Sequence, residues 1–250
     1  MDTINSKIAN LILKHENNEK KYIHAKECII VNENIITIEK IKPSGKVNGD
    51  IYNLKKLLIN PFQNLSAWQV AASNAVCKLK LNGISLNYRS NTYAGDSPLH
   101  LAVKNNCQYL VNTIINEYKS SILNIINFKN NLGETPLHIA FIGNYNPNIL
   151  SELIRNGADF TSKDNNGQTP LVMLLLFWKN KNYLINAILD WIKDYNIHDI
   201  DKKGQNLIYL SAAYQNKDIY NKLIQMGCNP HLKADDGKCA VDIYEFNKNI

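Results

Sequence analysis

The sequence predicts an all-α repeat solenoid, in which helix pairs stack side by side, preceded by a small α+β N-terminal cap. A short string recurs along the chain, and the copies Gly133–Ala140 and Gly95–Ala102 are almost identical. A polar turn precedes each copy, and an apolar pattern with helical spacing follows it. Steps of 38, 34, 37 and 33 residues separate the opening glycines of the five copies, which are Gly95, Gly133, Gly167, Gly204 and Gly237.

The letters of the string suit a turn that leads into a helix. The opening glycines stand where the chain reverses, at positions where a positive φ is expected. Thr135 offers a hydroxyl to the first free N–H groups of the helix, and Pro136 pre-sets φ at its first position. Leu137 and Ala140 lie three residues apart on one helix face, which lets neighbouring helices approach closely. Each copy therefore predicts the first helix of a helix pair.

A second helix is expected to run back antiparallel in each repeat and to end at a glycine. Residues 149–159 and 219–229 show this pattern, with an apolar face followed by Gly157 or Gly227. Residues 105–118 and 184–192 carry the same apolar spacing without a closing glycine. We expect these two repeats to be irregular, with longer exit loops.

This part of the chain resembles the ankyrin-repeat family, whose period is about 33 residues and whose signature contains Thr-Pro-Leu-His-x-Ala. The resemblance implies a solenoid that binds proteins on a concave surface of turn tips and first helices. It also implies that His100 and His138 form hydrogen bonds to turn backbone between repeats. Ankyrin proteins of this Asn-, Ile- and Lys-rich composition occur among effectors of intracellular bacteria, viruses of eukaryotes and AT-rich protists, and the resemblance does not choose among them.

Residues 1–60 are expected to form the cap. Residues 3–21 have the spacing of an amphipathic helix, with Ile4, Ile8, Leu11 and Ile12 on one side. Residues 28–41 have the β-branched content and polar break of a hairpin. This region either covers the open face of the first repeat or is an independent functional domain.

Residues 61–250 are expected to form the repeat array. The first repeat, 61–92, is degenerate, with Trp68 and Ala71 in the Leu and Ala places of the string. The last is a partial repeat at 235–250, which either caps the array or marks a longer chain that has been cut. Between them we expect repeats that start near residues 93, 131, 165 and 202.

Composition favours a globular protein of a reducing compartment. The chain is 45% hydrophobic and 20% charged, and its net charge of +6 is spread along the sequence, which disfavours a nucleic-acid surface. Its 5 cysteines have no paired spacing and favour free thiols. No apolar run is long enough to span a bilayer, and the N-terminus lacks the pattern of a secretory signal. We expect a monomeric cytoplasmic protein, or one of the host-cell cytosol if it is a secreted effector.

The sequence predicts no catalytic, cofactor-binding or metal-binding residues. Paired Cys and His spacings typical of zinc sites, Gly-rich phosphate loops and Gly-x-Ser-x-Gly elbows do not occur in it. His24 and Cys28 are spaced like a base and a nucleophile on a helix, but Cys28 opens an apolar strand-like run and no third orienting group is evident. We expect a protein that is not an enzyme, with an activity of residues 1–60 left open.

The function expected from the resemblance is that of a protein–protein interaction scaffold. Aromatic residues dominate binding hot spots, so Tyr93, Tyr145, Trp178 and Tyr214 are the preferred anchors, although Trp178 with its neighbour Phe177 could instead pack on an irregular loop. The alternative function is an effector or adaptor whose residues 1–60 carry an activity that the repeats deliver to a target. The expected partner-binding residues are Tyr93, Lys129, Asn131, Ile142, Tyr145, Asn165, Trp178, Lys202, Lys203 and Tyr214.

Overall fold

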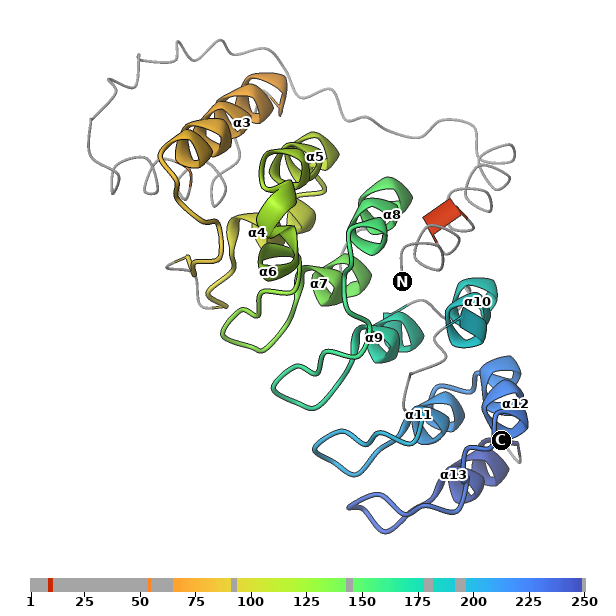
Figure 1. Ribbon diagram of the computed structural model, residues 1–250. Coiled ribbons are helices and arrows are strands. Elements are labelled where there is room, and N and C mark those ends of the chain that lie inside the picture. Colours follow the sequence, from red (N-terminus) through yellow and green to blue (C-terminus); the bar gives the residue numbers. More distant parts are fainter. Residues whose placement is uncertain are drawn as a thin grey trace.

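The computed structural model of the chain (Figure 1) describes residues 9–10, 54, 65–90, 94–142, 146–177, 182–191 and 197–248. Over these residues the fold is a stack of helix pairs joined by turns that all project from the same side of the stack. The described turns include two isolated antiparallel bridges, Ile200–Asn206 and Lys233–Cys239, and contain no longer strand. The predicted all-α repeat solenoid is therefore confirmed.

The first helices of the repeats form one layer, which we call the inner row. Each helix of this row packs on the next one along the stack. Pro98, Pro136 and Pro170 occupy the first helical positions of three of them, as the recurring string predicts. The inner row consists of α4 (Pro98–Lys104), α7 (Pro136–Ile142), α9 (Pro170–Phe177), α11 (Leu207–Ala213) and α13 (Ala240–Lys248).

The second helices form the other layer, which we call the outer row. It consists of α3 (Leu65–Leu81), α5 (Gln108–Glu117), α8 (Pro147–Arg155), α10 (Asn182–Trp191) and α12 (Lys217–Gln225). Helix α3 packs on α5, α5 packs on α8, and α10 packs on α12, whereas α8 and α10 do not pack closely on one another. Gly157 and Gly227 follow α8 and α12 with φ of 89° at both positions, which is the predicted left-handed end of a second helix.

The structure corrects one detail of the expected degenerate first repeat, which is the place of residues 65–81. The prediction placed Trp68 and Ala71 at the Leu and Ala positions of a first helix. The structure instead has the single helix α3 over this whole stretch, packed on α5 in the outer row. The physical reason is that residues 65–81 contain no glycine or proline to interrupt a helix. Gly83, with φ of 68°, then follows the end of α3.

The irregular exit predicted after α5 is confirmed. A 3-10 turn, Lys119–Ser121, and the short helix α6 (Ile122–Ile126) fill it. Three isoleucines of α6, Ile122, Ile125 and Ile126, are buried in the core that runs along the array. The isoleucines of α6 therefore extend the core in this repeat, in which no glycine ends the second helix.

The expected cap lies almost entirely outside the described residues. Of residues 1–60, the structure describes Ala9, Asn10 and Leu54. Leu54 has no exposed surface and belongs to the continuous core. The predicted helix over residues 3–21 and the predicted hairpin over residues 28–41 remain predictions. Among the described helices, none combines the length and hydrophobicity that crossing a membrane requires.

Candidate protein-interaction surface

His100 and His138 are buried in the inner row, and each joins its own repeat to the following one. His100 Nδ1 lies 2.6 Å from Ser97 Oγ in its own repeat, and its Nε2 donates to the backbone oxygen of Glu134 at 2.9 Å. His138 makes the same bond to Gln168 at 3.1 Å. Burial lowers the pKa of His100 to about 4 and also lowers the pKa of His138, so both rings are neutral at pH 7. The predicted structural role of these histidines is confirmed.

Buried polar side chains shape the turns. Asp164 Oδ1 accepts hydrogen bonds from the backbone N–H groups of Asn166 and Gln168, both at 2.8 Å. Asp201 repeats this arrangement in the next turn, and Asn130 does so in the preceding one. These side chains support the turn backbone and do not form a pair of carboxylates suited to acid–base chemistry.

A ladder of backbone hydrogen bonds links one turn to the next. The N–H of Asn131 donates to the oxygen of Ala94 at 2.7 Å, and the N–H of Asn165 donates to the oxygen of Leu132 at 2.8 Å. Lys202 and Asp235 continue the ladder, with donor–acceptor distances of 2.8 and 3.0 Å. The turns therefore form a continuous, mutually braced edge of the array.

Five of the predicted partner-binding residues are exposed on this edge. They are Lys129, Asn131, Asn165, Lys202 and Lys203. Two of these side chains also brace the edge, because Lys129 Nζ donates to the Lys163 backbone oxygen and Asn165 Nδ2 donates to the Asn131 backbone oxygen, both at 2.7 Å. A substitution of either one would change the stability of the edge as well as its surface. Lys202 and Lys203 are therefore the cleaner probes of binding.

Exposed apolar side chains end three consecutive inner helices. Ile142 at the end of α7 is 37% exposed, Phe177 at the end of α9 is 56% exposed, and Tyr214 directly after α11 is 38% exposed. We call these three residues the apolar ridge. Their position contrasts with Phe141, which is fully buried in the core. The ridge crosses three repeats on the inner row.

The predicted set contained Ile142 and Tyr214 but omitted Phe177. The sequence does contain a signal for Phe177. Thr169 and Asn206 occupy the same position in successive copies of the string, and Phe177 and Tyr214 each lie eight residues after them. Phe177 is 56% exposed, and the loop on which it was alternatively expected to pack lies outside the described residues. Tyr93, Tyr145 and Trp178 lie outside the described residues, and their roles remain predictions.

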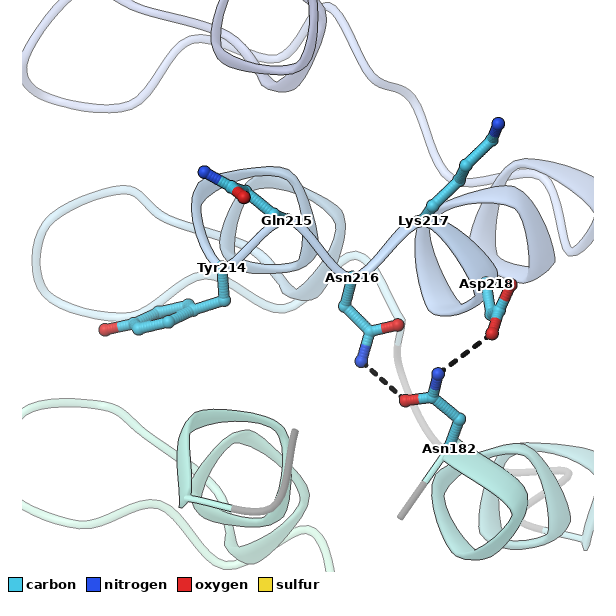
Figure 2. A pocket seen from close by; sticks show the side chains of 6 residues that line it. All are labelled: Asn182, Tyr214, Gln215, Asn216, Lys217 and Asp218. Carbon is cyan, nitrogen blue, oxygen red and sulfur yellow. Dashed lines mark hydrogen bonds between the residues drawn. The ribbon is translucent and has the colours of Figure 1, made fainter. Parts of the chain in front are cut away.

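A polar hollow lies beside Tyr214, between the loop that joins α11 to α12 and the start of α10 (Figure 2). Asn216 Nδ2 donates to Asn182 Oδ1 at 2.7 Å, and Asn182 Nδ2 donates to Asp218 Oδ2 at 2.9 Å. The Tyr214 ring points away from these polar groups (Figure 2). Because the polar side chains satisfy one another, we interpret the hollow as a link between repeats.

The described residues offer no metal site. Within them, no group of three His, Cys, Asp or Glu side chains converges in a way that could hold an ion. The surface that remains is the braced turn edge together with the apolar ridge. Such a surface is suited to non-covalent contact with a macromolecule.

Known families match this chain over its repeats. The family described as "Ankyrin repeats (3 copies)" matches residues 46–146, and the family described as "Ankyrin repeat" matches residues 132–165. These ranges include the strings that carry His100 and His138.

Several curated proteins are similar over part of the chain. NF-kappa-B inhibitor alpha of Homo sapiens is 42% identical over 80 residues, which are 32% of this chain and 25% of that protein. Putative ankyrin repeat protein FPV031 of Fowlpox virus is 35% identical over 131 residues, covering 50% of this chain and 37% of that protein. Ankyrin repeat protein B18 of Variola virus is 30% identical over 122 residues, covering 45% and 21%. The chain therefore spans well under half the length of each of these relatives.

A solved structure has the same fold over most of the chain. It is described as a predatory endopeptidase from Bdellovibrio bacteriovorus in complex with the immunity protein Bd3460. The matching chain covers 79% of this chain and 92% of its own length, with a TM-score of 0.56. Its identity of 22% limits the likeness to the fold.

Proposed function

This chain is an ankyrin-repeat protein, and from that premise we propose that it is a non-enzymatic scaffold that binds a partner protein on its inner row. The observation that carries the proposal is the apolar ridge, in which Ile142, Phe177 and Tyr214 remain exposed at the ends of three successive inner helices. Burial of aromatic and aliphatic side chains of this kind supplies most of the energy of protein interfaces.

The braced turn edge adds a second reason for binding on this side. The hydrogen bonds between turns hold the backbone of Asn131, Asn165 and Lys202 in place before any partner arrives. A rigid surface loses less conformational entropy on association than a mobile one. Lys202 and Lys203 are exposed on this edge and extend the proposed surface with polar contacts.

The relatives support a role in binding. One of them is named as an inhibitor of NF-kappa-B, and its similarity to this chain covers 80 residues. We carry over only the general expectation of a macromolecular partner. The alternative function for residues 1–60, the monomeric state and the cytoplasmic location stay predictions.

A capture experiment with a matched control tests the proposal. Wild-type chain, the double variant Phe177→Ala with Tyr214→Ala, and the control Tyr109→Ala are immobilised at equal amounts, and captured proteins are quantified by mass spectrometry. Tyr109 is a suitable control because it is aromatic, 55% exposed and lies on α5 in the outer row. We expect one protein to be enriched by wild type and control and reduced about tenfold or more by the double variant, as for hot-spot residues. Equal capture by all three folded chains would contradict the proposal.

A further inference from the structure

Helix α8 is buried more completely than its helical neighbours explain. It packs on α7 and α5, but it does not pack closely on α10, which is the next helix of the outer row. Its Ile and Leu residues are nevertheless at most 2% exposed, and Ser151 is 1% exposed. Ser151 and Arg155 are four residues apart, so they lie along one edge of α8. Arg155 is exposed, but the burial of Ser151 indicates that another part of the chain covers this edge at that point.

Two residues from the N-terminal region lie at this edge. Arg155 Nη2 donates a hydrogen bond to Asn10 Oδ1 at 2.6 Å, across 145 residues of sequence. Arg155 Nη1 also contacts Glu152 Oε1 at 3.3 Å, which orients the guanidinium group. Ala9 has no exposed surface, and Ala9 and Asn10 are both helical. Figure 1 shows this short red segment beside α8, away from the turns.

The sequence around Asn10 fits a covering role. Ile4, Ile8, Leu11 and Ile12 fall on one side of residues 3–21 at helical spacing, and Asn10 falls outside this stripe. A hydrogen bond from Arg155 to an amide outside the stripe leaves the apolar side available to cover the interval between α8 and α10. An amphipathic helix is stable in water only when such a stripe is buried.

We propose that the interval between α8 and α10 in the outer row is the docking site of the chain's own N-terminal segment, residues 3–21. The segment binds there as an amphipathic helix, and the hydrogen bond from Arg155 to Asn10 is its polar anchor. It covers the middle of the array and not the open face of the first repeat. Because the segment lies on the outer row, the apolar ridge stays free for a partner.

Hydrogen exchange of the full chain tests the docking. The variant Ile8→Asp with Leu11→Asp places two negative charges in the stripe, and the matched control Ser6→Asp with Asn17→Asp places two negative charges outside it. We expect the stripe variant alone to raise amide exchange in α8 and α10 about tenfold or more, because these helices lose their cover. Exchange in α11–α13 should stay unchanged and serves as the internal reference for folding.

Each other outcome also decides the proposal. Unchanged protection of α8 and α10 in the stripe variant would overturn it. Protection of α8 and α10 in the wild type that falls as the protein is diluted would assign the site to a second copy and would also overturn it. If the stripe variant exposes α11–α13 as well, Asn10→Ala replaces it: faster exchange confined to residues 3–21 supports docking, and no change contradicts it. Partner capture should persist in Asn10→Ala, which separates this proposal from the proposed function.

Discussion

His138 Nε2 lies 3.1 Å from the backbone oxygen of Gln168, so a ring buried in one repeat completes the turn of the next. The same ring accepts at Nδ1 from the backbone N–H of Thr135 at 3.0 Å. One side chain therefore fixes the entry to its own helix and the position of the following turn. Repeat proteins depend on such contacts because their stability comes from neighbouring units.

Replacing His138 should destabilise the array. His138→Ala leaves the Gln168 oxygen and the Thr135 N–H without their buried partner, and we expect a loss of about 1–3 kcal/mol in the free energy of unfolding. Denaturant titration followed by circular dichroism measures this loss. His231→Ala is the control, because His231 is exposed. Equal stabilities of the two variants would contradict the role assigned to the ring.

The buried histidines should also make the stability dependent on pH. Burial lowers the pKa of His100 from 6.5 to about 4, so the unfolded chain binds a proton more readily than the folded chain. The contribution of this group to stability is therefore complete above pH 6.5 and is lost as the pH falls towards 4. We expect the difference in unfolding free energy between wild type and His100→Gln to shrink from pH 7 to pH 4. A difference that stays constant with pH would mean that His100 has the same pKa in the folded and unfolded chain, which would contradict this prediction.

Two glycines with the same backbone form a matched pair for stability. Gly133 has φ of 76° and Gly237 has φ of 77°. A Cβ at Gly133 would lie 2.6 Å from the Asn165 side chain, whereas a Cβ at Gly237 would meet nothing within 4 Å. Gly237→Ala should cost about 1–2 kcal/mol for the left-handed backbone. Gly133→Ala should cost about 1–3 kcal/mol more, because the next turn must shift.

Thermal or denaturant unfolding of the two glycine variants measures the difference. Both substitutions add the same methyl group to nearly the same backbone conformation, so the contrast reports on the neighbouring turn. Equal losses would mean that the turns are not packed as closely as the structure has them.

Asn216 should contribute to stability through two repeats at once. Its Oδ1 accepts from the backbone N–H of Ile219 at 3.3 Å and caps α12, while its Nδ2 donates to Asn182 at 2.7 Å (Figure 2). We expect Asn216→Ala to lower the free energy of unfolding by about 1–2 kcal/mol. Asn221→Ala, an exposed substitution within α12, should change it by less than about 0.5 kcal/mol. Similar losses in the two variants would contradict the linking role of Asn216.

The sequence predicted those parts of the fold that depend on local chemistry. The turn glycines, Pro136 and the two motif histidines each follow from a rule about one turn or one helix end, and the structure confirms them. The place of α3 did not follow, because the row that a helix joins depends on its packing with α5. The hydrogen bond from Arg155 to Asn10 could not be predicted either, because no local sequence pattern relates residues that are 145 positions apart.

Only part of the candidate surface could be predicted, because local patterns place some of its residues and contacts between repeats decide the others. Lys202 and Lys203 were placed correctly at a turn because their distance from Gly204 fixes their position. Whether a side chain at a helix end is exposed depends on the repeat beside it. Phe177 was therefore missing from the predicted set, although it is the most exposed residue of the apolar ridge.

The central claim is that the inner row, and not the outer row, holds the partner. Hydrogen exchange of the full chain with and without the captured partner tests this most directly. We expect slower exchange at the ends of α7, α9 and α11 and along the turns from Asn131 to Lys203, with α5 and α12 unchanged. Protection confined to the outer row, with the apolar ridge exchanging as in the free chain, would contradict the account.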